Sequence, residues 1–245
     1  GGILAVLVVA AVCFFIQPQS QGSTNPAETP SVIDETPSAD QVDYAAQKAL
    51  NQDYLGHLYF ESGLVDELTV QGSDNEYYLK HTFEGQAVTA ASIFMDANNH
   101  ADFSDQNTFI YGHNMKDKTM FGKLNNYKDE EFYKETPYFY IYTPDYTYRY
   151  DIFSCYLARV DNEVDFYTQF ATDEQFQEFL DGVKAQSAYD TGVEVTPEEK
   201  VITLMTCNKA GYDYRFLVHA VQTEAVPNGD VAPAEENAGT GSEAE

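Results

Sequence analysis

The stretch VITLMTCNKAGYDYRFLVHAV, residues 201–221, decides the fold of this chain and locates its chemistry. Two apolar segments flank a polar loop that contains a glycine, the pattern of two β-strands joined by a turn. Cys207 closes the first strand and Arg215 opens the second. Because paired antiparallel strands bring their adjoining ends together, we expect the thiol and the guanidinium to lie at the same end of the hairpin.

Cys207 is a candidate nucleophile. A nearby cation favours the thiolate, and the thiolate is the form of cysteine that attacks carbonyl carbon. The alternative is a buried structural cysteine, since free cysteine is among the most buried residue types. A metal site is not favoured, because the sequence holds no close ligand pair such as CxxC or HxxxH. Cysteine chemistry of this kind needs no metal or organic cofactor.

The sequence contains three cysteines, Cys13, Cys155 and Cys207. An odd number without close spacing is not a disulfide framework. A bridge between Cys155 and Cys207 remains open at this point, and it would remove the candidate nucleophile.

The chain is strongly acidic, with a formal net charge of −27 over 245 residues. This balance argues against nucleic acid as a partner, because no basic patch is available to neutralise phosphates. Acidity is compatible with a surface domain outside a cell and with cationic substrates, although it often reflects only solubility. Residues 17–43 and 222–245 contain no Lys or Arg, so every basic residue falls within 44–221.

Composition divides the chain into four parts. Residues 1–16 are apolar and uncharged, about 24 Å of helix against a hydrocarbon core of about 30 Å, and we interpret them as the later part of a membrane signal-anchor whose first residues are missing. A truncated cleavable signal peptide and a buried core helix are the alternatives. Residues 17–37 are predicted to be a disordered linker, 38–222 a single folded domain, and 223–245 an acidic disordered tail.

The folded part is predicted to be mainly β. Many short apolar segments alternate with turn residues, and helical patterns are few, which favours a closed β-barrel over a doubly wound sheet. Ser38 and Gln41, and again Thr172 and Gln175, have the spacing of a helix capping box. The expected elements include a helical turn at 75–79, a short helix at 129–134, a helix at 173–188, and strands at 108–113, 138–142 and 148–160.

Among five histidines, His113 is the candidate base because it ends a strand and opens a polar loop, where functional side chains concentrate. His219 lies closer to Cys207 in sequence. It is four residues beyond Arg215, however, and about 13 Å along a strand is too far to serve the same thiol. We therefore expect His219 to be a packed strand residue. Arg215 could alternatively form an ordinary salt bridge, for instance with Asp213.

These residues carry a pattern that resembles a known family. TLMTC at 203–207, followed eight residues later by Arg215 and then FLVHA, resembles the catalytic hairpin of the sortases. YGHNMKDKTMFGKL at 111–124 resembles their catalytic-histidine segment. The segments that resemble the class B branch are QGSDNEYYL at 71–79, SIFMD at 92–96 and the helix at about 173–188. The resemblance covers roughly residues 40–222.

The resemblance implies a closed eight-stranded barrel with helices at the N-terminus and between the sixth and seventh strands. It also implies the role of each matching residue: Cys207 is the nucleophile, His113 the general acid and base, and Arg215 the group that stabilises the oxyanion. Asn75 and Leu79 match positions that line the substrate groove in class B relatives, and Thr206 also matches the motif. Met205 departs from the Ser common there, and segments 96–105 and 56–69 fit loosely.

The implied activity is that of a cysteine transpeptidase, tethered in the cell membrane with its catalytic domain on the extracellular face of a Gram-positive cell. It would cleave a C-terminal sorting signal at a Thr–Gly-like bond through a thioester, and transfer the protein to an amine of cell-wall peptidoglycan. Its partners would be surface proteins with sorting signals and a peptidoglycan precursor or pilin amine. The alternatives are a pilin-polymerising sortase with a lysine acceptor and a catalytically silent, membrane-tethered binding module.

Overall fold

The computed structural model describes residues 42–88, 92–207 and 213–229. The predicted signal-anchor at 1–16, the linker at 17–37 and the tail beyond residue 229 lie outside the described residues. Within the described ranges, no helix is both long and apolar enough to cross a membrane.

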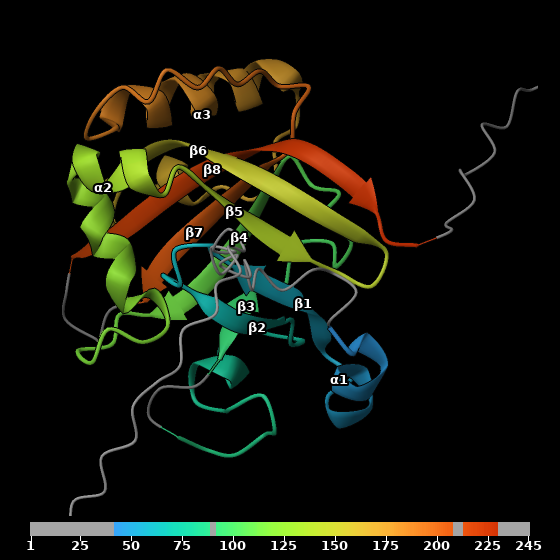
Figure 1. The fold of residues 1–245 in the computed structure, drawn as a ribbon. Coiled ribbons are helices and arrows are strands. Elements are labelled where there is room, and N and C mark those ends of the chain that lie inside the picture. Colours follow the sequence, from blue (N-terminus) through green and yellow to red (C-terminus); the bar gives the residue numbers. More distant parts are fainter. Residues whose placement is uncertain (1–41, 89–91, 208–212, 230–245) are drawn as a thin grey trace, which may run out of the picture. The chain divides into compact units, whose positions relative to one another are not determined.

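Eight strands form a closed barrel in the order β1-β2-β3-β4-β7-β8-β6-β5, as predicted (Figure 1). Most neighbouring strands are antiparallel, but β2 pairs with β3, and β4 with β7, in parallel. The strands are β1 (Tyr54–Tyr59), β2 (Asp66–Val70), β3 (Ile93–Met95), β4 (Asn107–His113), β5 (Tyr138–Tyr142), β6 (Tyr146–Arg159), β7 (Val201–Cys207) and β8 (Tyr214–Pro227).

In the described ranges, three α-helices and three short 3₁₀ helices precede or connect the strands. The α-helices are α1 (Tyr44–Leu50), α2 (Glu130–Glu135) and α3 (Asp173–Gln186), and the 3₁₀ helices are η2 (Tyr77–Leu79), η3 (Phe121–Lys128) and η4 (Glu163–Phe166). α1 precedes the barrel and α3 lies between the sixth and seventh strands, as the resemblance implied.

The first helix begins later than the capping pattern predicted. Asp43 is its N-cap, and the Asp43 carboxylate accepts a hydrogen bond from the amide of Ala46 at 2.9 Å. Ser38 and Gln41 lie outside the described residues. The second predicted cap is confirmed, since Thr172 Oγ1 accepts a hydrogen bond from the amide of Gln175.

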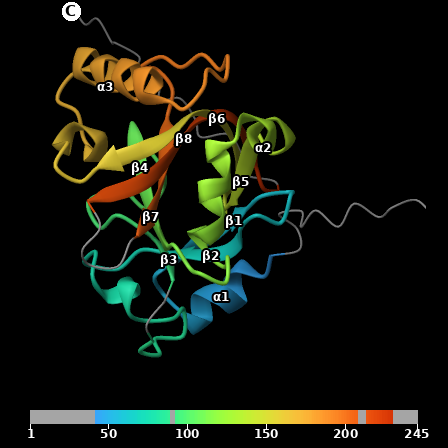
Figure 2. The same ribbon diagram turned by 90° about the vertical axis from the view of Figure 1, so that its left-hand side faces the viewer.

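α3 lies beside β6 and β8 in both views (Figures 1 and 2). Its buried face consists of Phe176, Phe179, Leu180 and Val183, the four residues that the helical periodicity selects. They pack against Phe153, Leu217 and Val221 of the barrel wall. Burial of this apolar face, rather than helix propensity, holds α3 in place.

His219 is a packed strand residue, as predicted. Its ring is fully buried and stacks on Tyr156 with ring centroids 5.5 Å apart. Thr203 Oγ1 donates to the side chain of Asn107, so the same hydroxyl accepts a hydrogen bond from His219 Nδ1 at 2.9 Å.

Cys155 is a free thiol in the barrel core, so the bridge to Cys207 is not formed. Its Sγ atom lies 3.1 Å from the carbonyl oxygen of Tyr127 and 3.3 Å from the hydroxyl of Tyr189. Burial raises the pKa of this thiol. Cys155 therefore behaves as a structural residue, because a buried thiol with a raised pKa supplies little thiolate.

The last strand runs further than the apolar pattern of residues 201–221. β8 continues through Pro227 and pairs there with Tyr146 at the start of β6. Its final residues, from Thr223 on, belong to the stretch that composition assigned to the acidic tail.

Candidate active site

Two parallel strands, β4 and β7, end at the same place. Their register pairs run from Asn107 with Val201 to His113 with Cys207, so the two candidate catalytic residues are partners at the last position. Parallel strands have their carboxyl ends on the same edge, which puts both residues at one end of the barrel. At Cys207 the description covers the backbone alone.

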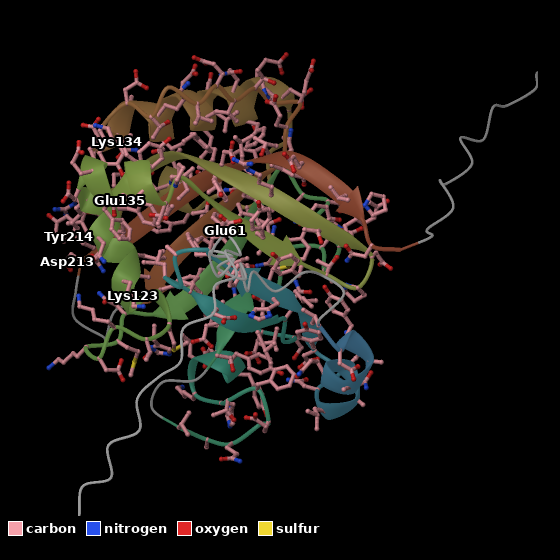
Figure 3. The ribbon with its side chains drawn as sticks, in the orientation of Figure 1. Glu61, Lys123, Lys134, Glu135, Asp213 and Tyr214 are labelled. Atoms are coloured by element: carbon pink, nitrogen blue, oxygen red, sulfur yellow. The ribbon has the colours of Figure 1, made fainter. Side chains whose placement is uncertain are left out.

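Arg215 lies on the next strand. The β7–β8 pairs run as far as Met205 with Leu217, and two further steps in this register align Cys207 with Arg215. Thr206 fixes the pairing between them: its hydroxyl accepts a hydrogen bond from the amide of Phe216 at 3.0 Å and donates to the carbonyl of Phe216 at 3.3 Å. Figure 3 labels Asp213 and Tyr214, where β8 begins.

The backbone holds the imidazole of His113 in one orientation. His113 Nε2 lies 3.0 Å from the carbonyl oxygen of Leu79. A carbonyl oxygen can only accept, so Nε2 carries the hydrogen of this bond. The other ring nitrogen, Nδ1, is then the atom that can take up and release a second proton.

The loop that supplies this carbonyl is fixed by a buried carboxylate. Asp96, 4% exposed, accepts hydrogen bonds from the side chains of Asn75 at 2.8 Å and of Tyr111. Asn75 also accepts from the amide of Ala97 at 2.8 Å. Both ends of the Asn75 amide are therefore used inside the protein, and the loop from Asn75 to Leu79 is tied to β3 and β4.

Sequence reasoning missed Asp96 and Tyr111 as members of this arrangement. The signal that was available is an acidic residue directly after the buried strand Ile93–Met95. A carboxylate at the end of an apolar strand is costly to bury unless hydrogen-bond donors surround it. The sequence did not say which donors these would be.

The three predicted groove residues occupy different settings. Leu79 is half-buried, packs against the cluster of Val70, Tyr78 and Phe94, and lies next to His113 through its carbonyl. Asn75 is bonded to Asp96 and Ala97. Thr206 is 1% exposed and bonded to β8.

The segment that follows His113 folds back against it. Asn114 and Met120 form an isolated antiparallel bridge, and the ring of Phe121 packs on Gly112. A Cβ atom at Gly112 would lie 2.5 Å from that ring, so a larger residue does not fit without rearrangement. The described part of the chain contains no group of three or more His, Cys, Asp or Glu side chains able to hold a metal ion.

Comparison with known proteins places the chain in a family. The model of the sortase domain matches residues 68–223. Sortase B of Listeria monocytogenes is 38% identical over 162 residues, which are 65% of this chain and 64% of that protein. Sortase B of Staphylococcus aureus is 31% identical over 168 residues, 68% of each. The chain thus spans slightly less than two thirds of the length of the Listeria relative.

Comparison with solved structures leads to the same family. A substrate complex of Staphylococcus aureus sortase B has a TM-score of 0.71 at 29% identity, covering 74% of this chain and 84% of that one. Clostridium perfringens sortase B has a TM-score of 0.69 at 30% identity, covering 74% and 99%. The chain belongs to the sortase family, whose members are cysteine transpeptidases. Its relatives and structural neighbours are class B sortases, and it groups with that branch.

Proposed function

We propose that this protein is a class B sortase that cleaves a C-terminal sorting signal at a Thr–Gly-like bond and transfers the released protein to an amine. One observation carries the proposal: His113 and Cys207 are register partners at the end of β4 and β7. Continuing the β7–β8 register by two residues aligns Arg215 with Cys207. A thiol, an imidazole and a guanidinium at one barrel end can supply a nucleophile, a proton carrier and an oxyanion partner.

In the first step, the thiolate of Cys207 attacks the carbonyl carbon of the scissile bond. The carbonyl π electrons move to oxygen, and the Arg215 guanidinium stabilises the resulting oxyanion. When the oxyanion collapses, the C–N bond breaks and a thioester remains on Cys207. The departing amine takes a proton from His113.

In the second step, an incoming amine attacks the thioester carbonyl and gives a proton to His113. The C–S bond then breaks, a new amide is formed, and Cys207 leaves as thiolate. We assign the moving proton to His113 Nδ1, because the bond to the Leu79 carbonyl occupies Nε2. The cycle ends with every catalytic group restored, and it requires no metal or cofactor.

The proposed groove residues act in different ways. Leu79 would contact the sorting signal, since it lies beside His113 at the end of η2. Asn75 would shape the groove by holding this segment to Asp96. Thr206 would keep β8, and with it Arg215, in register.

We propose peptidoglycan, or its precursor, as the source of the amine, because the relatives and neighbours are class B sortases. A pilin lysine is the second candidate acceptor, and the two differ only in the group that carries the amine. The same family membership and the apolar sequence of residues 1–16 support a location at the cell membrane, with the catalytic domain outside.

A transfer assay tests the proposal. The protein is incubated with fluorogenic LPxTG-like and NPxTN-like peptides and with either a glycine-based amine or a lysine-containing pilin peptide. We expect cleavage of one peptide class, a transfer product with the cell-wall type of amine, and neither with Cys207→Ala. Turnover by Cys207→Ala would refute the assignment of Cys207 as the nucleophile. Binding of peptides without cleavage by the unaltered protein would support the silent binding module instead.

A further inference from the structure

A positively charged segment follows His113 in a protein that is otherwise strongly acidic. Residues 114–128 contain four lysines and one acidic residue, whereas the whole chain has a formal charge of −27. We call Lys116, Lys118, Lys123 and Lys128 the lysine strip. Such a local reversal of sign attracts anions to one place on a surface that repels them elsewhere.

Packing holds the lysine strip next to the candidate acid and base. The bridge between Asn114 and Met120 closes a short loop directly after His113, with Lys116 and Lys118 inside it. The Phe121 ring on Gly112 anchors the far side of this loop, and a Cβ atom at Gly122 would lie 2.5 Å from the carbonyl oxygen of Met115. The strip is therefore part of the barrel end that carries His113.

Among the described residues, the only hydrogen bond that a strip ammonium forms is from Lys123 Nζ to the carbonyl oxygen of Gly63 at 3.1 Å. None of its four lysines forms an ion pair with a described residue. Asp117, the acid within the segment, accepts hydrogen bonds from the amide and the hydroxyl of Thr119. Lys134 provides the contrast, because it is paired with Glu130 at 3.1 Å and Glu131 at 2.7 Å. Figure 3 labels Lys123 of the strip and Lys134.

The strip and the proposed sorting-signal groove contact different strands beside β4. η3, which ends at Lys128, contacts β4, β6, β7 and β8, and the Lys128 ammonium lies 5.3 Å from the centre of the Phe216 ring. The segment from Asn75 to Leu79 is instead bonded to the residues that follow β3 and packs near Tyr111 of β4. The two segments therefore lie against different neighbours of β4.

We propose that the lysine strip receives the amine acceptor, and that the acceptor recognised there carries a carboxylate. This inference rests on the proposed transpeptidase function. The lysines attract the carboxylate, and a positive environment also disfavours the ammonium form of the amine. The amine must be neutral to attack the thioester, and the effect of the strip on the ammonium form is common to every amine acceptor. Attraction of the carboxylate is therefore what favours an acceptor that carries one over an otherwise equal acceptor that does not.

Two acceptors that differ by a single charge test the proposal. Triglycine with a free carboxylate and triglycine amide are compared as acceptors for the full chain, by their kcat/KM in the transfer step. We expect the free carboxylate to be preferred roughly five- to tenfold at low salt, the size that a few exposed charges produce, and the preference to shrink as salt is added. In Lys116→Gln/Lys118→Gln the ratio should fall towards one.

Lys184→Gln/Lys200→Gln is the control for charge, since it removes the same charge from α3, where Lys184 pairs with Glu194, and from the residue before β7, at the strand end remote from Cys207. Its preference should equal that of the unaltered protein. Equal use of both acceptors by the unaltered protein, or a preference that survives in Lys116→Gln/Lys118→Gln, overturns the proposal.

Thioester formation is followed in the same samples by intact mass. If no thioester forms with any sorting peptide, the proposed function itself fails and the inference fails with it. Binding to vesicles of anionic phospholipid is measured in parallel. If removal of Lys116 and Lys118 abolishes vesicle binding but leaves the acceptor ratio intact, the strip contacts a lipid surface and the acceptor proposal is wrong.

Discussion

His113 lies directly across the β4–β7 ladder from Cys207, at the last register position of two parallel strands. The pairing makes the relative position of the two residues a property of the barrel itself rather than of a loop. Sites built on strands are held more precisely than sites built on loops. The first prediction concerns this pair and the arginine aligned with it.

Loss of the imidazole should slow turnover without unfolding the protein. We expect His113→Gln to lower kcat/KM by about 10²- to 10⁴-fold, the range that general acid–base catalysis supplies. We expect Arg215→Ala to cost about 10²- to 10³-fold, as for other oxyanion donors. Peptide-transfer kinetics measure both, with thermal unfolding as the control for folding. Full activity in either variant would refute the assigned role.

The buried carboxylate of Asp96 should matter to both stability and activity. Asp96→Ala leaves the donors of Asn75 and Tyr111 without their acceptor, at a cost of about 1–3 kcal/mol for each buried group. Because the released segment supplies the carbonyl that orients His113, we also expect kcat/KM to fall. Tyr111→Phe, which removes one donor and leaves the carboxylate, should have a milder effect. An Asp96→Ala variant with unchanged kinetics would show that the loop does not position the imidazole.

The buried imidazole of His219 should make stability depend on pH. Burial lowers the pKa of His219 from 6.5 to about 3. Below pH 6.5 the unfolded chain binds a proton on this residue that the folded chain does not bind, so the free energy of unfolding falls as the pH drops towards 3. In this range the protonation of His219 changes the free energy of unfolding by about 1.4 kcal/mol per pH unit. Above pH 6.5 the residue adds no pH dependence.

Urea unfolding at a series of pH values measures this slope. In His219→Phe, the free energy of unfolding should change less steeply between pH 6 and pH 4, by the slope that corresponds to about one bound proton. This holds whatever the overall stability of the variant. Equal slopes in the two proteins would mean that the imidazole is protonated in the folded state or that it titrates normally.

Cys155 should be dispensable for catalysis. Cys155 is fully buried, and its Sγ contacts the Tyr127 carbonyl and the Tyr189 hydroxyl. We expect Cys155→Ala to lose about 1–3 kcal/mol of stability through a small cavity, while the Tyr189 hydroxyl still donates to the Tyr127 carbonyl. Its kcat/KM at 20 °C should equal that of the unaltered protein. A folded but inactive Cys155→Ala would contradict the choice of Cys207 as nucleophile.

Much of this architecture could be predicted from local patterns. Alternation of apolar residues in β7 and β8, with a polar loop between them, was enough to place Cys207 and Arg215 at one end of a hairpin. The strand at 138–142 and the apolar face of α3 were also correct, because each depends on the residues of one segment. These elements follow from periodicity alone.

Contacts between distant segments could not be predicted in the same way. The parallel pairing of β4 with β7 joins residues about ninety positions apart, and their sequences do not specify the register. The hydrogen bonds from Asn75 to Asp96 and from His113 to Leu79 arise only once the barrel has brought three loops together. The start of α1 was misplaced because two capping residues, Ser38 and Asp43, compete within six positions and the sequence does not rank them.

Intact-mass spectrometry of the protein with a library of sorting peptides tests the central claim most directly. The account predicts a covalent adduct whose mass equals the peptide's acyl portion, located on Cys207 by digestion and absent from Cys207→Ala. Adduct formation should persist in Cys155→Ala. An adduct on any other residue would contradict the assignment of Cys207 as the nucleophile. The assignment would also be contradicted if no adduct formed and Cys207 did not react with a small alkylating reagent in the same sample.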